Sequence, residues 1–356
     1  MKSNLLVYPK KVIRRIIHDK IPRLSVSSKR LSALYYFLFD RSFDREIQSV
    51  LAGKIRHLDE AKRNEGNYFL LVRNTHRIEK GLLMQPRREV FGKEYITETI
   101  SSFEGIWISS REDTSNAQIK WFYDVISEYF DKVNLSDPII RDAAERFKKV
   151  VSEYSPEISS PDASKSIPYY RAKENAHPIS YEAFFSLCKQ RRSVRWFLDK
   201  KVPRELIDKA ILAANQAPSA CNRQPFEFRI FDEPELVNQV VKLPMGTTGY
   251  AHSIPVMIVL VGNLDAYFDE RDRHVIYIDA SLASMCFMLA LESMGLSSCS
   301  INWPDIESRE SQMHTFLNLK THQRPIMCMG IGYPNPNGLV AFSEKRPLNQ
   351  IRKYNL

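Results

Sequence analysis

The sequence predicts an α+β domain in the C-terminal half of the chain, preceded by an all-helical region. After about residue 178, helical and strand-like segments alternate, and the dense apolar runs at 255–261 and 325–331 are typical of strands covered on both faces. Before about residue 155, apolar residues recur only at helical spacing. We therefore divide the chain into a helical region (1–155), a Ser- and Pro-rich linker without periodicity (156–177) and an α+β domain (178–356).

The helical region is predicted from apolar stripes. They are Ile47, Leu51, Ile55 and Leu58 in one helix, and Trp121, Val125, Ile126 and Tyr129 in another. A leading segment, 10–39, mixes basic residues with apolar ones. Such a segment can lie on a membrane surface, but we favour its packing onto the rest of the chain.

The elements of the α+β domain follow in order. Pro203 begins a helix, where its missing N–H does no harm. Phe226, Phe228 and Ile230 then alternate as in a strand. A long apolar helix over 278–294 ends at Gly295, and Asp279 is expected to cap its start.

Composition narrows the class of protein. The 356 residues are 44% hydrophobic and 26% charged, as in ordinary globular proteins, and we find no apolar run long enough to span a membrane. Five cysteines without a CxxC pair argue against disulfides and zinc, and no signal peptide is recognised, so we expect a cytoplasmic protein without a metal.

The positive charge is concentrated near the N-terminus. Residues 1–95 carry 21 Lys and Arg against 10 Asp and Glu, whereas residues 181–356 carry 20 against 18. This excess could attract an anionic partner, but we favour a solvated helical face. The aromatic and glycine pattern of a nucleic-acid module is missing, so we expect no nucleic-acid partner.

The strongest chemical signal is the run QRRSVRWF at 190–197. Arg191, Arg192 and Arg195 place three guanidinium groups beside the hydroxyl of Ser193. Guanidinium forks match phosphate oxygens in a bidentate manner, and the hydroxyl adds a neutral donor. From these residues alone, a phosphate site and a solvated basic turn both stay open.

Four further segments give this run a context: APSACNRQPF at 217–226, GLSSCSINW at 295–303, GIGYP at 330–334 and KRPL at 345–348. In this order, the segments of residues 181–356 resemble the nitroreductase superfamily of FMN-dependent oxidoreductases. The resemblance implies a three-layer α+β fold, with a central, mostly antiparallel sheet flanked by helices. It also implies a homodimer with FMN at the subunit interface.

The resemblance also implies roles for individual residues. Arg191, Arg192 and Ser193 would hold the phosphate and ribityl chain of FMN, Arg195 would reach the pyrimidine end, and Lys345 and Arg346 would add to the phosphate site. The remaining cofactor contacts would pack on the ring, orient that loop, or line the ring edge mostly through backbone groups: Pro218, Ser219, Asn222, Gln224, Ser300, Ile301, Asn302 and Trp303.

The activity so implied is reduction of FMN at N5 by NAD(P)H, followed by reduction of a second small molecule, nitroaromatic or quinone-like in vitro. Hydride transfer is a matter of positioning, so no catalytic side chain is assigned. One alternative is a binding module for a phosphorylated ligand. Another is different flavin chemistry, such as reductive dehalogenation, in a setting such as polysaccharide biosynthesis.

Two groups of residues are left with two interpretations each. In the uncharged loop 245–250, Thr247, Thr248 and Tyr250 either contact substrate or belong to a plain connection. In the helical region, His76, Glu79 and Lys80 either belong to a helix end at Gly81 or form a lid over the flavin.

Overall fold

The computed structural model describes residues 12–13, 16–62, 66–110, 117–154, 165–170 and 178–355. Within these residues, the C-terminal domain is built on a sheet of four antiparallel strands in the order β1-β2-β4-β3. The strands are β1 (Phe226–Phe231), β2 (Val256–Asn263), β3 (Ser297–Asn302) and β4 (Gln323–Gly332). The predicted α+β fold is confirmed, and β2 and β4 coincide with the two apolar runs.

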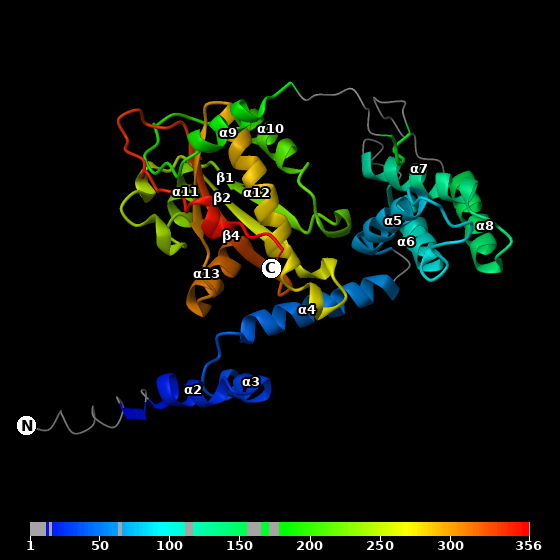
Figure 1. Ribbon diagram of the computed structural model, residues 1–356, viewed down its shortest axis with the longest axis horizontal. Coiled ribbons are helices and arrows are strands. Elements are labelled where there is room, and N and C mark those ends of the chain that lie inside the picture. Colours follow the sequence, from blue (N-terminus) through cyan, green and yellow to red (C-terminus); the bar gives the residue numbers. More distant parts are fainter. Residues whose placement is uncertain are drawn as a thin grey trace, which may run out of the picture.

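Helices cover both faces of this sheet (Figure 1). Val256, Ile258 and Leu260 of β2 pack with α10 (Arg204–Ala214) and α12 (Val275–Ser293), while the alternate residues Met257 and Val259 pack with α11 (Pro234–Val240) and α13 (Glu307–Leu317). This alternation follows from the two-residue period of a strand. Two peripheral helices, α9 (Tyr181–Gln190) and α14 (Leu348–Ile351), complete the domain.

The central helix α12 begins earlier than predicted. It starts at Val275, so Asp279 lies inside it and is buried. The capping role expected for Asp279 is therefore wrong. The end of the helix is as predicted: Gly295 takes a left-handed φ of +77°, and the Leu296 N–H donates to the carbonyl of Leu291 at 3.0 Å.

One helical stretch of the described chain, Glu270–Ser293, is long and apolar enough to cross a membrane. The sequence analysis did not recognise it. Most of the stretch is α12, whose Phe287 and Leu291 are fully buried against the sheet. A core helix meets the same criteria of length and composition, and its packing gives α12 that role.

The N-terminal region is helical, as expected. Four helices, α5 (Tyr68–Leu82), α6 (Ile96–Ser109), α7 (Ala117–Lys132) and α8 (Pro138–Glu153), form a bundle with its own core. Val125, Ile126 and Tyr129 of the predicted stripe are fully buried in it. Most of the predicted linker lies outside the described residues, but the backbone N–H of Ser166 donates to Asp124 of α7.

Helix α4 (Asp44–Lys62) joins this bundle to α2 (Ile21–Ser25) and α3 (Lys29–Leu38), and lies against the C-terminal domain (Figure 1). It contacts the domain through small and polar residues. A Cβ on Gly53 would lie 2.6 Å from the backbone of Leu264, and His57 Nδ1 lies 2.8 Å from the carbonyl of Asp265. Lys54 forms an ion pair with Glu270 at 2.7 Å. Close approach of two backbones thus adds to the apolar contact of Val50 with the cluster around Leu264.

The apolar residues of α4 face the other way. Ile47, Leu51, Ile55 and Leu58 are all exposed, although their spacing is that of a core-facing stripe. The packing predicted for the leading segment is also wrong in its described part, because Leu34, Phe37 and Leu38 of α3 are exposed and Tyr35 alone in that helix is buried.

Candidate functional site

The arginine run follows α9 and continues beside β3. Glu292, near the end of α12, accepts hydrogen bonds from Gln190 Nε2 and Ser297 Oγ, both at 3.1 Å, and so joins the end of α9 to the start of β3. Ser193 then pairs in parallel with Ser298, and the Val194 N–H donates to the Ser298 carbonyl at 3.0 Å. The run is therefore an ordered extension of the sheet edge.

This edge carries polar atoms without partners. Arg191 Nε and Ser298 Oγ are buried, and neither makes a hydrogen bond within the described residues. A buried donor left unpaired costs about 1–3 kcal/mol, so such atoms need a partner. The guanidinium of Arg191 and the hydroxyl of Ser298, on the arginine run and on β3, could each donate to an oxygen of an anion. Arg192 also lies here, with Nη1 on the carbonyl of Arg191 at 3.2 Å.

Arg195 is brought to the loop that contains the candidate substrate residues. Its Cζ lies 5.8 Å from the centre of the Tyr250 ring, and its carbonyl accepts from Ser253 Oγ at 2.6 Å. Burial and the neighbouring Cys299 raise the pKa of Tyr250, whose hydroxyl lies 3.5 Å from Cys299 Sγ. The exposed guanidinium of Arg195 thus stands next to a neutral phenol.

The two threonines of that loop differ from each other. Thr247 is buried, and its hydroxyl donates to the carbonyl of Val241 at 2.6 Å, so it stabilises the loop and is withdrawn from any substrate. Thr248 is exposed, with a 3.4 Å contact to the carbonyl of Met245. Of the two hydroxyls, only that of Thr248 faces solvent.

The loop containing Pro218 and Ser219 is held by its own polar groups. Ser219 Oγ accepts from the N–H of Gln224 at 3.1 Å, and Gln224 Nε2 donates to Asn222 Oδ1 at 3.1 Å. Pro218 is exposed at its start. Three of the four side chains predicted to contact or orient the flavin therefore form one hydrogen-bonded unit.

The same loop is strained. Cys221, Asn222 and Gln224 have φ of 53°, 55° and 49°, in the left-handed region that non-glycine residues seldom adopt. Asp279 of α12 holds the loop by accepting the Ala220 N–H at 3.0 Å, and burial raises the pKa of this carboxyl. Strained backbone that persists in this way is typical of ligand-binding loops.

The two parts of the site lie at opposite ends of α12. Asp279 anchors the strained loop and Glu292 anchors the arginine run, and thirteen helical residues separate them by about 20 Å. Leu282 and Met285 lie between them and, with Ile278 directly before Asp279, form an exposed apolar stripe. Within one chain, the loop is thus far from the arginine run.

The four residues of β3 and its end divide between two environments. Ser300 donates to Met288 Sδ at 3.0 Å, and Asn302 is exposed, so both lie on the α12 side of the sheet. Ile301 and Trp303 are buried in the opposite core, where Trp303 Nε1 donates to Glu310 Oε1 at 2.5 Å. The side chains of Ile301 and Trp303 are core residues, which leaves only their backbone for a ring edge.

The two C-terminal cations lie on the tail that follows β4. Lys345 and Arg346 are exposed, and neither side chain has a hydrogen-bond or ion-pair partner in the part of the chain that the structure describes. The tail that carries them leaves β4 beside the run, since Phe197 pairs with Pro334 and the Asn335 N–H donates to the Trp196 carbonyl at 3.0 Å.

The helical bundle touches the strained loop through α5. A cavity of about 560 Å³ lies between them, lined by Tyr68 and Phe69 of α5, Trp121 of α7, and Asn222 and Gln224 of the loop. Arg73 Cζ lies 4.8 Å from the centre of the Phe268 ring, so α5 presents this cation to the domain, and burial, with the nearby charges of Arg77 and Arg223, lowers its pKa.

His76 and Glu79 lie elsewhere on α5. His76 Nδ1 is 3.3 Å from Glu79 Oε2, and Trp121 Nε1 donates to Glu79 Oε1 at 2.9 Å, which directs this pair to α7 inside the bundle. Lys80 is exposed. Gly81 lies within the last turn, where a Cβ would meet the Phe91 ring at 2.2 Å, and the helix ends at Leu82.

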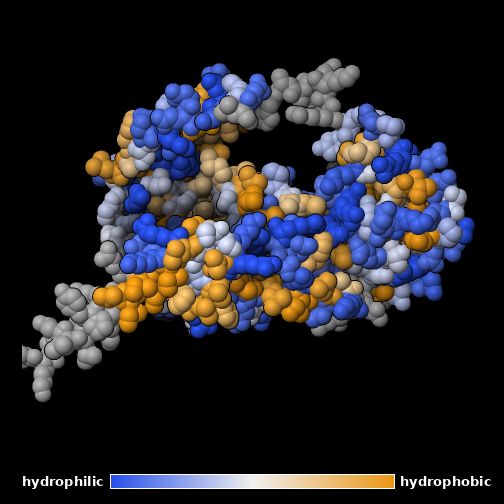
Figure 2. All heavy atoms as spheres, turned by 60° about the horizontal axis from the view of Figure 1, so that its bottom comes forward, coloured by the Kyte–Doolittle hydropathy of each residue, from blue (hydrophilic) through white to orange (hydrophobic). Residues whose placement is uncertain are grey.

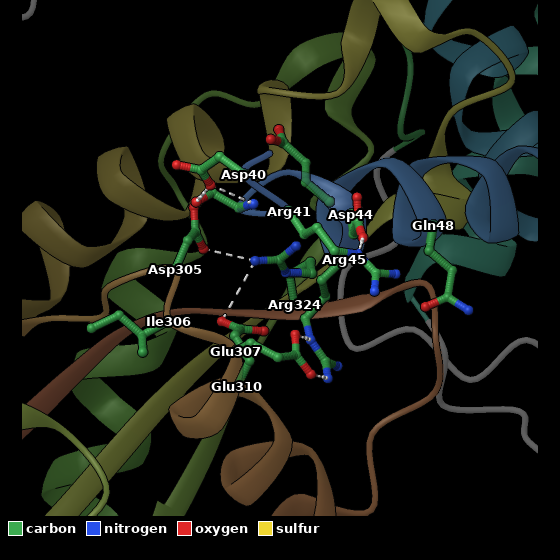
Figure 3. A pocket seen from close by; sticks show the side chains of 12 residues that line it. Asp40, Arg41, Asp44, Arg45, Gln48, Asp305, Ile306, Glu307, Glu310 and Arg324 are labelled. Atoms are coloured by element: carbon green, nitrogen blue, oxygen red, sulfur yellow. Dashed lines mark hydrogen bonds and ion pairs between the residues drawn. The ribbon is translucent and has the colours of Figure 1, made fainter. Parts of the chain in front are cut away.

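The most spacious cavity described, about 910 Å³, lies between α4 and α13 (Figure 3). Arg324 is fully buried there, with Nη2 on Asp305 at 2.7 Å and 3.5 Å from Glu310, and Arg45 of α4 is paired with Glu307. Arg324 Nε and Nη1 have no partner among the described residues. Its lining holds six carboxylates and three guanidinium groups. Such a cavity is unsuited to a phosphate and serves the contact between α4 and the domain.

Comparison with known proteins places the arginine run within a recognised family domain. A model of the nitroreductase family matches residues 188–248 and 242–333, a span that includes the run, the strained loop and all four strands. Residues 188–333 form a nitroreductase-family domain. The domain is that of a flavin oxidoreductase, and the helical region precedes it.

Relatives of the nitroreductase-family domain differ in what they act on. Iodotyrosine deiodinase 1 of Sus scrofa is 26% identical over 198 residues, which cover 48% of this chain and 68% of that protein. A predicted NADH dehydrogenase/NAD(P)H nitroreductase of Methanothermobacter thermautotrophicus is 29% identical over 150 residues, covering 42% and 76%. A solved structure of the same description from Parabacteroides distasonis is 26% identical, with a TM-score of 0.43, and covers 48% of this chain and 98% of that one.

Sequence reasoning missed three residues of this site. Ser298 supplies an unpaired hydroxyl, Glu292 joins α9 to β3, and Asp279 anchors the strained loop. Ser298 stood within the recognised segment GLSSCSINW, so its place on the strand could have indicated it. The roles of the two acids could not be found from the sequence, because Asp279 accepts from a backbone N–H 59 residues away and Glu292 from a side chain 102 residues away.

Proposed function

We propose that this protein is an FMN-dependent oxidoreductase that uses NAD(P)H to reduce a small organic acceptor. The observation that carries the proposal is the pair of unpartnered buried donors, Arg191 Nε and Ser298 Oγ, on the segment that the family model matches. An FMN phosphate would supply the missing acceptors. Family membership supports a flavin at this place, and the relative from Methanothermobacter supports a nicotinamide reductant.

When bound, FMN would supply hydride transfer through N5 of its ring. The chain's own residues would then bind and orient. Arg191, Arg192 and Ser193 would hold the phosphate, and the exposed cation of Arg195 would stabilise negative charge on the reduced ring. The strained loop at 218–224 would cover the ring and exclude water, because its backbone is already fixed by Ser219 and Asp279.

We propose a homodimer as the working form. One chain separates the loop from the arginine run by about 20 Å along α12, and the apolar stripe of Ile278, Leu282 and Met285 is exposed on this helix. A twofold pairing through α12 would cover the stripe and carry the loop of one subunit to the arginine run of its partner. Cofactor binding and dimerisation would then depend on each other.

We place the acceptor in the cavity between α5, α7 and the strained loop. Its walls combine aromatic surface from Tyr68, Phe69 and Trp121 with the amides of Asn222 and Gln224. Such a wall suits a flat ring with polar substituents. The helical region would thus shape the acceptor site, although through Tyr68 and Trp121 rather than through the predicted His76 and Lys80.

The decisive experiment is the visible spectrum of the purified protein, before and after FMN and then anaerobic NADPH or NADH. We expect flavin absorption that bleaches with either nicotinamide and returns with a nitroaromatic or quinone. A protein that stays colourless in excess FMN would overturn the proposal and favour a module for another phosphorylated ligand. We place the enzyme in the cytoplasm, where a nicotinamide reductant is at hand.

Reductive dehalogenation is a second candidate, favoured by the similarity to iodotyrosine deiodinases. In this case a halogenated phenol would accept the electrons and release halide. If nicotinamides fail to bleach the flavin but dithionite does, release of iodide from iodotyrosine by the chemically reduced protein would separate this candidate from the first.

A further inference from the structure

The outer face of α3 and α4 is apolar in an unusual way. In α4, the residues turned to the domain are Ser49, Gly53 and His57, whereas the stripe begun by Ile47 and Leu51 is exposed. In α3, the side chain of Phe37 is 74% exposed. A surface helix normally turns its apolar stripe to the core. The described residues leave this apolar face exposed, so we infer that a binding partner covers it.

The exposed residues form a continuous surface. Figure 2, turned so that the lower side of Figure 1 comes forward, shows an apolar band along this edge of the molecule. It is made by exposed side chains of α2 to α4 and their connections: Leu24, Val26, Leu31, Leu34, Phe37, Leu38, Phe39, Phe43, Ile47, Leu51, Ile55 and Leu58. Between α3 and α4 the band is hollowed by a cavity of about 740 Å³ with mainly apolar walls. Patches of this kind mark a binding surface.

Charge indicates what covers the band. Residues 1–41 of the sequence contain ten Lys and Arg and two acidic residues, a formal +8 of the chain's +9. Lys20, Lys29 and Arg30 are exposed there. A second copy bound through the same face would bring two such segments together and repel. Apolar side chains beside exposed cations are instead the composition of a segment that lies on an anionic bilayer.

We propose that the α2–α4 face binds the surface of an anionic phospholipid bilayer. The apolar band enters the boundary of headgroups and acyl chains, and the basic segment pairs with lipid phosphates. This inference is independent of the flavin chemistry.

Flotation of the full chain with vesicles tests the proposal. We expect binding to phosphatidylcholine vesicles that contain 30% phosphatidylglycerol, weak binding to pure phosphatidylcholine, and release from the anionic vesicles by 0.5 M salt. Replacing both Lys29 and Arg30 by Gln should weaken binding about five-fold for each cation, and Phe37→Ser with Leu51→Ser about ten-fold or more for each residue. Leu212 is an exposed leucine of α10, and Leu212→Ser is therefore the matched control, which should bind like the parent chain.

Two results would overturn the proposal. One is the absence of binding, or equal binding to neutral and anionic vesicles. The other is self-association without lipid, beyond any dimer, that Leu51→Ser abolishes in sedimentation experiments, because the face would then be an interface between copies. Absorbance spectra and thermal unfolding of each variant confirm that it is folded.

Discussion

Two helices of this chain, α12 and α4, each carry an exposed apolar stripe, and the two stripes differ in their surroundings. On α12, Leu282 and its neighbours lie between Asp279 and Glu292, the two acids that fix the halves of the proposed cofactor site. On α4, Leu51 and its neighbours lie beside the strongly basic N-terminal segment, and the opposite face of the helix is already docked on the domain.

This difference shows that an apolar stripe predicts only that one face of a helix is buried, and not what buries it. Its periodicity is the same whether the cover is the core, a second copy or a lipid surface. What surrounds the stripe decides between these. The stripe of α12 lies beside the anchors of the two proposed cofactor segments, whereas the exposed cations Lys20, Lys29 and Arg30 accompany that of α4.

The largest effect is expected from a charge in the α12 stripe. Leu282→Asp would place an unpaired carboxylate in the proposed dimer interface, at a cost of about 3–5 kcal/mol for each copy, enough to dissociate a dimer of ordinary affinity. Because we expect each FMN to touch two subunits, cofactor retention should fall with the dimer. Sedimentation and flavin absorbance measure the two together.

The matched control is the same substitution in the other stripe. Leu51→Asp, on α4, should keep the dimer and its FMN and lose vesicle binding. If Leu282→Asp leaves the dimer and its flavin intact, the stripe of α12 is not the dimer interface. If Leu51→Asp removes both, the stripe of α4 is that interface.

The sequence predicted the domain well, because its signals are local. The alternation of β1, the apolar run of β2 and the glycine after α12 each depend on neighbours along the chain, and Gly295 and the strands lie where expected. The errors concern partners. Asp279 does not cap α12, because its partner is the N–H of Ala220, 59 residues away, and the apolar stripe of α4 is helical as expected but exposed. Neither partner can be identified from periodicity.

For the candidate site, too, the sequence predicted the local motifs but not their arrangement in space. The arginine run and the loop at 218–224 were recognised as motifs, and each is an ordered unit. Their separation along α12 could not be predicted, because it depends on tertiary packing. For the same reason Trp303, a residue of the recognised segment, lies in the core on Glu310.

The next effect concerns the arginine run itself. Arg191→Ala should weaken FMN binding by about 1.5–3 kcal/mol, or about 10- to 150-fold in Kd, since it removes a charged hydrogen bond to phosphate. Titration of the apoprotein with FMN, followed by flavin fluorescence, gives this number. Arg204→Ala, which removes an exposed ion pair with Asp232, should leave it unchanged. An unaltered Kd for Arg191→Ala would remove the phosphate assignment.

The smallest effect concerns the pH dependence of stability, to which the two sides of the domain contribute with opposite sign. Burial, with the charges of Arg45 and Arg324, lowers the pKa of His314 to about 4, on the α4 side. The unfolded chain therefore binds more protons than the folded one between about pH 4 and 6.5, so this contribution is complete above pH 6.5 and is lost as the pH falls. Burial has the opposite effect on Asp279, on the α12 side: its pKa is raised, so its contribution grows as the pH falls.

The free energy of unfolding of the parent chain falls between pH 7 and pH 5, and we expect this decrease to be about 2 kcal/mol smaller in His314→Gln. Urea unfolding at both pH values measures it. The reason is that glutamine cannot take up the proton that the buried imidazole refuses. Asp279→Asn should not reduce the loss, because the carboxyl on the α12 side opposes it. Equal losses in the parent chain and His314→Gln would show that acid acts elsewhere, and the contact of α4 with α13 would then carry no special sensitivity to pH.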